Sequence, residues 1–567
     1  MSKGLKKWKL FESKKRSDLD LPFWFLNILE KRGLTSKKNV TNYLQPKYES
    51  LTPFDNFLGT KEAAERISKA VKEEEKIVIY GDYDVDGLTA TTLIYELLSK
   101  IGALNFETYI PHRESEGYGL NKGAIDGFIK SEVDLVITVD CGITSKGLID
   151  EAKNIDFIVV DHHQIDFDKL PQKSINIHPS LTKDKREYSL SGCGIAFYLA
   201  KAVQQRFMNE FPPGQEKWLL DLVALATICD IVPLIGENRT LATWGLKVLS
   251  KTKRVGLLAL AKSASINLEE VTSYEVGFSL GPRLNAAGRI EHAKLALELL
   301  TTKDGHRAQM IAKELSELNT ERQKMCERII TEAREELKNS NQKEHKIFLL
   351  SNKNWPRGVV GIVASRISDE HHKPVIVFEN DGQNHHGSAR SIDGFDIVEA
   401  LGSCNECLEK FGGHAKAAGL TVKDEKFVIF SDRIVFLANE KIKEEDLVKT
   451  IEIDTKINSV EINDKALDLI AKMEPTGFGN QKPVFLIEGV TVEDVNRVGK
   501  GREHLKFKIQ QIKTKNQQSK EIGGISFNEE RELEEAGKYD MVGTLKYNIW
   551  NNRKSIEFRM IDFRKSD

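Results

Sequence analysis

Three aspartates at alternate positions, Asp82, Asp84 and Asp86, carry the clearest chemical pattern in the sequence. They follow the apolar run IVIY and precede an apolar-periodic stretch, which predicts an acidic loop between a strand and a helix. On an extended backbone all three carboxylates would point to one side. Three crowded anions are costly unless a cation neutralises them, so the triplet indicates a metal site.

A calcium loop of the EF-hand type is one alternative, because D-x-D-x-D-G matches the first half of its pattern. That loop needs a glutamate at its twelfth position, which is Leu93 here, and a helix before it, where this chain has VIY. The EF-hand is therefore excluded. A solvated acidic turn without a ligand stays open.

Polar clusters also follow two later apolar runs. Asp140 ends the run DLVITVD, and Asp161, His162 and His163 follow the run FIVV. Apolar runs that alternate with helical segments lie at residues 77–80, 106–110, 134–140, 156–161 and 175–178. This alternation predicts a parallel sheet covered by helices, in which ligands bind at the carboxyl ends of the strands. We therefore expect the three clusters to meet at one edge of the sheet.

A fourth acidic position, Asp230, ends the apolar stretch WLLDLVALATICD, which is expected to be a buried helix. A carboxylate there needs a partner, because an unpaired buried charge is costly. A metal ion is one such partner. A hydrogen bond to the turn before Pro233 is the other.

Composition limits the class of protein. The chain has 567 residues, of which 40% are hydrophobic and 30% charged, and its formal net charge is −2. These values predict a soluble protein of several domains that has no global basic field for nucleic acid, so a polyanion would need local basic grooves. The sequence has neither an apolar run of about 20 residues nor the core of a signal peptide, and its six cysteines are scattered. We expect a cytoplasmic protein with no membrane partner.

The rest of the chain divides by pattern. Residues 1–55 suggest a short helical preface with no chemistry, and residues 304–339 suggest a connecting helix about 50 Å long. A second small α/β unit follows at about 345–435. Two of its segments, Ser388-Ala389-Arg390 and Gly412-Gly413-His414, are expected to be small-residue loops that suit a phosphate or a sugar.

The last 110-odd residues change to short β segments with glycine turns, which predicts a small barrel. Basic residues run from Lys500 to Lys515, and aromatic residues accompany them at Phe507, Tyr547 and Trp550. Charge combined with stacking rings is how OB barrels bind single strands. The alternative is a barrel that only packs on its neighbour. If the barrel does grip DNA, we expect it to be separable from catalysis.

Seven motifs together resemble the DHH phosphoesterase superfamily and, within it, the RecJ family of bacterial single-strand-specific exonucleases. They are GDYDVDG, VDCG, VVDHHQ, CDIVPL, GPRLNAAGRI, GSARS and GGHAKAAG, in the order of the family. The resemblance covers nearly the whole chain after residue 55. It implies an α/β fold in which a parallel-sheet DHH domain is joined by a long helix to a smaller DHH-associated domain, with an OB-like barrel at the C-terminus. The implied boundaries are 1–55 preface, 56–300 DHH domain, 301–340 connecting helix, 341–440 DHH-associated domain and 450–567 OB domain.

The resemblance also implies the site. It predicts two divalent ions, Mn²⁺ or Mg²⁺, in a cleft between the two lobes, with Asp82 binding either directly or through a neighbour. The metal ligands would be Asp82, Asp84, Asp86, Asp140, His162 and Asp230. His163 would act beside them as an acid, a base or an orienting group, so that the catalytic residues would be Asp140, His162 and His163. The family places substrate phosphate contacts at Arg113, Arg283, Asn285, Arg289, Ser388, Arg390, Gly413 and His414.

The activity implied is metal-dependent hydrolysis of single-stranded DNA from the 5′ end to 5′-mononucleotides, in DNA repair and recombination. A single-strand-binding protein and a helicase are the implied protein partners. A phosphodiesterase of oligoribonucleotides or cyclic dinucleotides, or a pyrophosphatase of the same superfamily, is an alternative, but such enzymes are shorter and lack the barrel. A non-catalytic single-strand-binding scaffold is the other alternative, and it would be expected to have lost metal ligands.

Overall fold

The computed structural model describes residues 6–13, 19–113, 115–510, 522–550 and 553–566. The chain forms two compact units. We call Arg32–Asn319 with Lys465–Lys482 the first unit, and Met1–Lys31, Thr320–Asp464 and Pro483–Asp567 the second unit. Each unit is described by itself.

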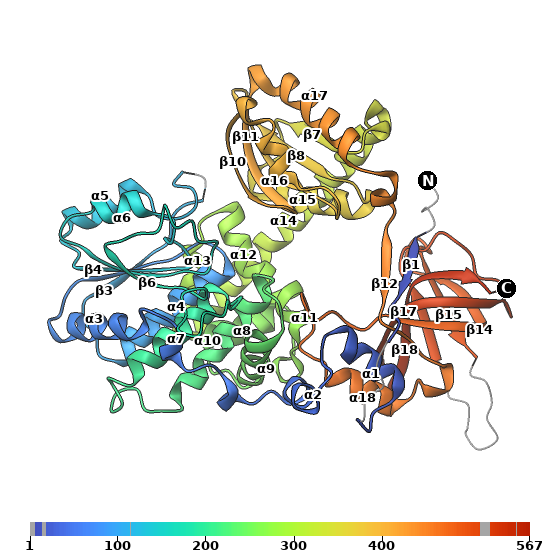
Figure 1. The fold of residues 1–567 in the computed structure, drawn as a ribbon, viewed down its shortest axis with the longest axis horizontal. Coiled ribbons are helices and arrows are strands. Elements are labelled where there is room, and N and C mark those ends of the chain that lie inside the picture. Colours follow the sequence, from blue (N-terminus) through green and yellow to red (C-terminus); the bar gives the residue numbers. More distant parts are fainter. Residues whose placement is uncertain (1–5, 14–18, 114, 511–521, 551–552, 567) are drawn as a thin grey trace. The chain divides into compact units, whose positions relative to one another are not determined.

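A five-stranded parallel sheet organises the first unit (Figure 1). Its order is β3-β2-β4-β5-β6, and every neighbouring pair is parallel. The strands are β2 (Ile77–Tyr80), β3 (Phe106–Tyr109), β4 (Leu135–Val139), β5 (Asp156–Val160) and β6 (Ser174–Ile177). The five strands predicted from the apolar runs are confirmed within one or two residues at each end.

Helices cover both faces of this sheet, which explains why its strands are almost continuously apolar. On one face lie α3 (Thr60–Lys72), α4 (Val85–Lys100) and α7 (Gly192–Gln204), and on the other lie α5 (Lys122–Lys130) and α6 (Lys146–Glu151) (Figure 1). Alternate residues of β2 enter the two cores: Ile79 packs with the first set of helices and Val78 with the second.

Six further helices of the first unit follow the sheet in sequence. They are α8 (Leu220–Cys229), α9 (Gly236–Leu249), α10 (Val255–Ser263), α11 (Ser273–Glu275), α12 (Gly281–Ile290) and α13 (Lys294–Thr301). The expected buried helix that ends at Asp230 is confirmed by α8. The motif GPRLNAAGRI forms the helix α12, so its small residues are helix-packing positions; Leu284, Ala286 and Ala287 are buried.

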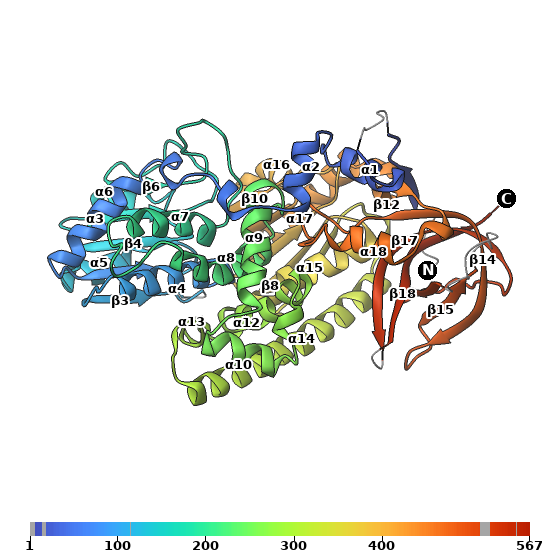
Figure 2. The ribbon, with the colours of Figure 1, turned by 90° about the horizontal axis from the view of Figure 1, so that it is seen from below.

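A single 35-residue helix, α14 (Gly305–Asn339), belongs to both units and confirms the predicted connecting helix (Figure 2). Its first half contributes Ile311 and Leu315 to a core of the first unit, and its second half contributes Ile329 and Ile330 to a core of the second. None of the described helices is both long and apolar enough to cross a membrane.

The second unit contains the predicted small α/β domain. Its sheet has the order β10-β11-β9-β8-β7, with β7 (Phe348–Asn352) and β8 (Val375–Asn380) parallel and the other pairs antiparallel. The helices are α15 (Arg357–His371), α16 (Ile397–Gly402) and α17 (Asp424–Lys441). The expectation of two small-residue loops is wrong. Ser388 and Arg390 lie in β9 (Asn384–Arg390), and Gly413 and His414 lie in β10 (Leu408–His414), which pairs with β11 (Ala417–Lys423).

The predicted barrel is confirmed. Strands β14 to β18 form a closed sheet, because β14 pairs with both β15 and β17, and β18 joins β17 to β16. They are β14 (Phe485–Val498), β15 (His504–Ile509), β16 (Ile522–Ser526), β17 (Lys538–Trp550) and β18 (Arg553–Lys565).

The N-terminal preface contains the expected helices, α1 (Phe23–Lys31) and α2 (Lys37–Leu44). It also contains a strand that the sequence pattern did not predict, β1 (Lys7–Leu10). This strand pairs in parallel with β12 (Thr450–Ile453), whose sequence position is more than 400 residues away.

Candidate metal centre

The aspartate triplet is split between a loop and a helix. Asp82 follows β2, Asp84 is the N-cap of α4, and Asp86 lies in the first turn of that helix. The Asp84 side chain accepts a hydrogen bond from the Gly87 backbone amide at 3.1 Å. The expectation of a fully extended triplet is therefore wrong, because Asp84 caps the helix and ends the extended backbone. Gly87 permits the close return of the chain, since a Cβ there would lie 2.6 Å from the Asp82 carbonyl oxygen.

Asp86 is fixed by the start of another helix. Its two carboxylate oxygens accept hydrogen bonds from the backbone amides of Gly192 at 2.6 Å and Cys193 at 2.7 Å, at the N-terminus of α7. Helix N-termini favour negative charge, so this contact fixes the carboxylate in one orientation and opposes the rise of its pKa that burial causes.

Asp140 lies directly after β4 with a left-handed backbone, at φ 62°. Aspartate tolerates this region better than most residues, and such conformations are concentrated at functional sites. Its amide donates to the Val160 carbonyl at 2.9 Å, which ties the end of β4 to the end of β5. A Cβ on Gly192 would lie 2.8 Å from the Asp140 side chain, so the glycine lets α7 approach the carboxylate.

Asp161 orients the histidine pair that follows β5. It accepts hydrogen bonds from the amides of His162 and His163, from His163 Nδ1 at 2.8 Å, and from the Ile143 amide at 2.9 Å. Burial alone would raise the pKa of Asp161, but these donors hold it well below its usual range. Burial would likewise lower the pKa of His163, but the bond to Asp161 raises it to about 9. Asp161 thus stays ionised and fixes His163 as an imidazolium.

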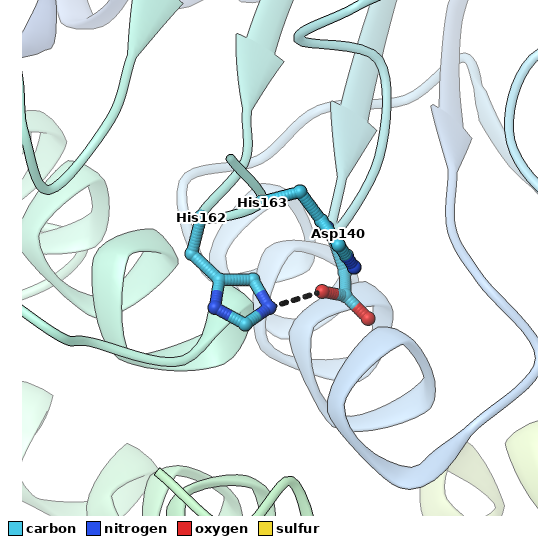
Figure 3. Close-up of side chains that lie close together, drawn as sticks. All are labelled: Asp140, His162 and His163. Carbon is cyan, nitrogen blue, oxygen red and sulfur yellow. Dashed lines mark ion pairs between the residues drawn. The ribbon is translucent and has the colours of Figure 1, made fainter. Parts of the chain in front are cut away.

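The side chains that follow β2, β4, β5 and α8 converge. His162 Nε2 lies 3.1 Å from Asp140 Oδ1 (Figure 3), 3.6 Å from Asp86 Oδ2 and 3.6 Å from Asp230 Oδ2. Potential ligand atoms lie within 4.8 Å of one another in three overlapping groups: Asp82, Asp84 and Asp140; Asp86, His162 and Asp230; and Asp140, His162 and His163. All six predicted metal ligands are therefore brought together, and Asp82 is as close as the others.

The charge balance of this cluster calls for cations. Burial raises the pKa of four carboxyl groups, those of Asp82, Asp86, Asp140 and Asp230. Neighbouring carboxylates add to the effect, and the pKa of Asp230 reaches about 8. Among the described residues, Asp82 Oδ1 and Asp140 Oδ1 are buried without a hydrogen-bond partner. Buried oxygens of this kind, with one imidazole, fit hard divalent ions such as Mg²⁺ and Mn²⁺.

Tyr118 is a residue of the site that the sequence analysis missed. Its hydroxyl donates to the Asp140 carbonyl oxygen at 3.2 Å and lies 3.0 Å from the ring nitrogens of His163. The ring is half exposed beside the two histidines. In the sequence, the segment EGYGL shows a tyrosine between two glycines and gives no sign of a functional role. The position of Tyr118 beside the histidines is visible only in the fold.

The predicted phosphate contacts of the first unit lie at several places around the aspartate loop. The Arg113 guanidinium lies 5.1 Å from the Tyr83 ring centre, and its charge lowers the pKa of Asp82 against the effect of burial. The charges of Arg113 and Arg289 both act on Tyr83, whose pKa burial raises to about 12. Asn285 Oδ1 accepts from the Val85 amide at 3.1 Å, at the start of α4.

Arg283, on α12, forms hydrogen bonds with other helical residues of the first unit. Its Nη1 donates to the Ser279 carbonyl at 2.8 Å, and its Nε donates to Ser316 Oγ on α14 at 3.2 Å. The hydrogen bond to Ser316 links α12 to α14, whereas the bond to Ser279 stays within the preceding turn.

The four predicted contacts of the second unit are Ser388, Arg390, Gly413 and His414. Arg390 donates to Ser365 Oγ at 2.9 Å and to Ser388 Oγ at 3.1 Å. Gly361 on α15 leaves room here, since a Cβ on it would lie 3.0 Å from Ser388 Oγ. Ser365 was not predicted, although it lies in the motif WPRGVVGIVASRI. His414 is exposed at the end of β10, and Gly413 before it has a φ of 144°.

Comparison with known proteins gives consistent results over the whole chain. Family models match at three places: the DHH family N-terminal domain at residues 76–227, the DHHA1 domain at 344–444 and the RecJ OB domain at 453–562. The chain is 37% identical over 554 residues to the single-stranded-DNA-specific exonuclease RecJ of Bacillus subtilis, covering 95% of this chain and 68% of that protein. It is 34% identical over 511 residues to the RecJ of Thermus thermophilus, covering 90% and 71%.

Solved structures are similar as well. The structure of T. thermophilus RecJ in complex with Mn²⁺ matches with a TM-score of 0.82 at 30% identity, covering 99% of this chain and 80% of that one. The structure of an exonuclease RecJ bound to manganese matches with a TM-score of 0.60 at 34% identity, covering 70% of this chain and 100% of that one.

Proposed function

This chain belongs to the RecJ family of single-stranded-DNA-specific exonucleases, and we propose that its carboxylate cluster hydrolyses single-stranded DNA from the 5′ end with two divalent metal ions. Mn²⁺ and Mg²⁺ are the ions found in structures of its relatives. The products are 5′-mononucleotides, and the role is in DNA repair and recombination.

The observation that carries this proposal is the gathering of the six ligand candidates in overlapping groups, in each of which the ligand atoms lie within 4.8 Å of one another, with Asp140 and His162 each shared by two groups. Two buried carboxylate oxygens there have no hydrogen-bond partner within the described part of the chain, and the pKa values of four carboxyl groups are raised by burial. A site of this kind is unfavourable without cations and suited to two of them.

Asp82, Asp84 and Asp140 would hold one ion, and Asp86, His162 and Asp230 the other. Ions held in this way make water more acidic and stabilise the charge of an attacking and a leaving oxygen. The chain's own contribution is to fix the ligands: α7 amides orient Asp86, and Asp161 with Tyr118 orients the histidine pair. His163, oriented by Asp161, would donate a proton to the departing 3′ oxygen.

The 5′-to-3′ direction of degradation would come from a site that binds the terminal phosphate. We assign phosphate contacts to Arg113 in the first unit and, as a separate position, to Ser388 and Arg390 in the second. A guanidinium that is fixed by two serine hydroxyls, as Arg390 is, is pre-organised for a phosphate.

The barrel would bind the single-stranded DNA. Lys500, Arg502 and Lys506 are exposed on it, whereas Lys508 pairs with Asp494 at 2.9 Å. Lys513 and Lys515 lie outside the described residues. A helicase and a single-strand-binding protein are the partners that this role calls for, because the substrate must first be unwound. None of the six cysteines is joined in a disulfide, which is in keeping with a reducing compartment such as the cytoplasm.

The test is a substrate panel. The purified protein with Mn²⁺ is given end-labelled single-stranded DNA, blunt duplex DNA and a dinucleotide of the same 5′ sequence. Rapid release of mononucleotides from the single strand, with slow cleavage of the duplex, is expected. Preference for the dinucleotide over the long strand would favour the small-substrate phosphodiesterases instead.

A further inference from the structure

The backbone that follows Asp230 is unfavourable by itself. Asp230 caps the C-terminus of α8, and Ile231 comes next with a φ of 59°. A β-branched residue rarely adopts the left-handed region, and such residues persist only where the surroundings hold them. The Ile231 side chain is 66% exposed and therefore packs against little. The conformation must be maintained by the residues after it.

Those residues are held by a distant part of the sequence, residues 472–480, which we call the bracing turn. The Leu234 amide donates to the Phe478 carbonyl at 2.8 Å. The turn closes on itself, since the amides of Gly477 and Asn480 each donate to the other's carbonyl, at 3.0 and 3.1 Å. It is thus a defined structure that presents one acceptor to the loop after Asp230.

Two glycines bring the bracing turn into direct contact with that loop. A Cβ on Gly477 would lie 2.8 Å from Leu234 Cδ1, and a Cβ on Gly479 would lie 3.0 Å from Pro233 Cβ. The Leu234 side chain is almost fully buried. Even one added methyl group on the turn would therefore push against the loop.

Arg239 fixes the bracing turn to the first unit. Its side chain lies on α9 and is only 2% exposed. The guanidinium donates to five backbone carbonyls: those of Tyr43 at 2.8 Å, Lys472 at 3.1 Å, Met473 at 2.9 Å, Glu474 at 3.0 Å and Pro475 at 3.3 Å. Four of these carbonyls belong to the bracing turn. Asn480, fully buried, binds two of them from the other side, Met473 at 2.9 Å and Pro475 at 2.7 Å.

We propose that the bracing turn, fastened by Arg239, positions the metal ligand Asp230. Groups behind a metal ligand set its orientation, and their loss weakens metal binding about 10 to 100-fold. Arg239 and Gly477 are positioning residues in this scheme, since they act through the loop of residues 231–235. The inference rests on the proposed function, because it requires Asp230 to bind an ion.

The test measures Mn²⁺ binding by the full chain, with the electron paramagnetic resonance signal of free Mn²⁺ as the readout. Gly477→Ala is the main variant, because it adds one methyl group beside Leu234 and removes no hydrogen bond. Arg239→Met is the second variant, and Asp230→Asn is the reference for loss of the ligand itself. Two controls come from the same unit: Gly127→Ala, on the exposed side of α5 with nothing near its Cβ, and Arg66→Met, which removes a largely buried arginine paired with Glu75 and Asp156.

We expect Gly477→Ala and Arg239→Met to weaken one of two Mn²⁺ sites about tenfold or more, as Asp230→Asn does, while both controls bind Mn²⁺ like the wild type. Nuclease activity of Gly477→Ala should then recover at high Mn²⁺. Normal Mn²⁺ binding in a folded Gly477→Ala protein, with weakened binding in Asp230→Asn, would overturn the bracing role alone. Unchanged binding in Asp230→Asn would instead remove Asp230 from the proposed metal site.

Discussion

At the scale of single residues, the site depends on carboxylates that are crowded, buried and held in place by backbone amides. Asp86 is an example, since backbone amides of α7 donate hydrogen bonds to both of its carboxylate oxygens and fix the orientation of the carboxylate. Asp161 does the same for the histidines without being a ligand candidate itself. The polar clusters could be predicted, because their positions after apolar runs are visible in the sequence, whereas the choice of six ligands among them came from the resemblance to the DHH superfamily. Tyr118 and Gly192 could not, because their roles depend on loops that meet only in the fold.

Asp140→Asn and His162→Ala test the ligands. Each change removes an atom that is expected to bind an ion directly, so turnover should fall by more than the roughly 10 to 100-fold typical of residues behind the ligands. Steady-state hydrolysis of single-stranded DNA in Mn²⁺ measures the loss, and circular dichroism checks the fold. Asp126→Asn, an exposed position on α5, is the control. Near-normal turnover in either folded variant would contradict the assignment.

Stability of the metal-free protein should fall as pH rises from 5 to 8. The pKa of Asp230 is raised to about 8 and that of His163 to about 9, so the folded protein binds more protons than the unfolded chain over this range. Unfolding free energy then decreases with pH, by at most about 1.4 kcal/mol per pH unit for each titrating group. Urea unfolding in chelator measures the slope, and saturating Mn²⁺ should flatten or reverse it. A rise of stability with pH in chelator would contradict the raised pKa values.

At the scale of elements, strand and helix periodicity predicted the parallel sheet, α8, α14 and the barrel well, because long apolar patterns determine these elements. For two glycine-rich stretches the prediction from the sequence was wrong. Residues 388–390 and 412–414 were expected to be loops, yet they lie in β9 and β10, where Ser388 faces the close approach of Gly361 on α15 and Gly413 adopts a φ of 144°. Composition alone does not distinguish a glycine that permits a turn from one that permits close approach.

Arg390 on β9 is predicted to set the preference for a 5′ phosphate. Arg390→Met should weaken binding of 5′-phosphorylated strands by about 1.5–3 kcal/mol, the range for a charge-assisted contact, and should leave 5′-hydroxyl strands unaffected. Competition binding with the two kinds of strand measures the difference. Arg366→Met is the matched control, because Arg366 is exposed on α15. Equal discrimination by Arg390→Met and the wild type would exclude the role.

The barrel strands correct one expectation about base stacking. Phe507 is 1% exposed within the barrel, so it cannot stack on a base, and the expectation that it does is wrong. Its alternation with Lys506 and Lys508 on β15 shows why: the basic residues face outward and the ring faces the core. The Trp550 side chain lies outside what the structure describes.

Phe507→Ala should therefore act on stability, lowering the unfolding free energy by about 3–5 kcal/mol. Tyr547 is half-buried, with Lys554 Nζ 3.5 Å from its ring centre, and Tyr547→Ala should instead weaken single-strand binding by about 1–3 kcal/mol. Denaturant unfolding and fluorescence anisotropy separate the two effects. The reverse pattern would show that the assignment of inner and outer faces is wrong.

Lys500 and Lys506 test the grip of the barrel. Replacing both with glutamine should reduce the salt dependence of single-strand affinity by about 0.7 in the logarithmic slope for each phosphate that a lysine no longer neutralises. Lys456→Gln is the control, since Lys456 pairs with Glu488 at 2.8 Å. A salt series of binding constants gives the slopes, and an unchanged slope in the double variant would place the DNA elsewhere.

At the scale of the whole molecule, the carboxyl-terminal region is not simply an appended module. Residues 465–482 fold with the first unit, although the segments on either side of them, Thr320–Asp464 and Pro483–Asp567, belong to the second. This stretch carries the bracing turn, so we expect that removing it together with the barrel would also affect the first unit. Sequence patterns could not reveal the connection, since it rests on backbone carbonyls bound by one arginine.

Whether one edge of the parallel sheet holds two catalytic metal ions can be decided by anomalous diffraction from crystals grown with Mn²⁺. We expect two manganese peaks, about 3.5–4 Å apart, one among Asp82, Asp84 and Asp140 and the other among Asp86, His162 and Asp230. A structure at saturating Mn²⁺ with no peak at these side chains, or with manganese bound only elsewhere, would contradict the two-metal site.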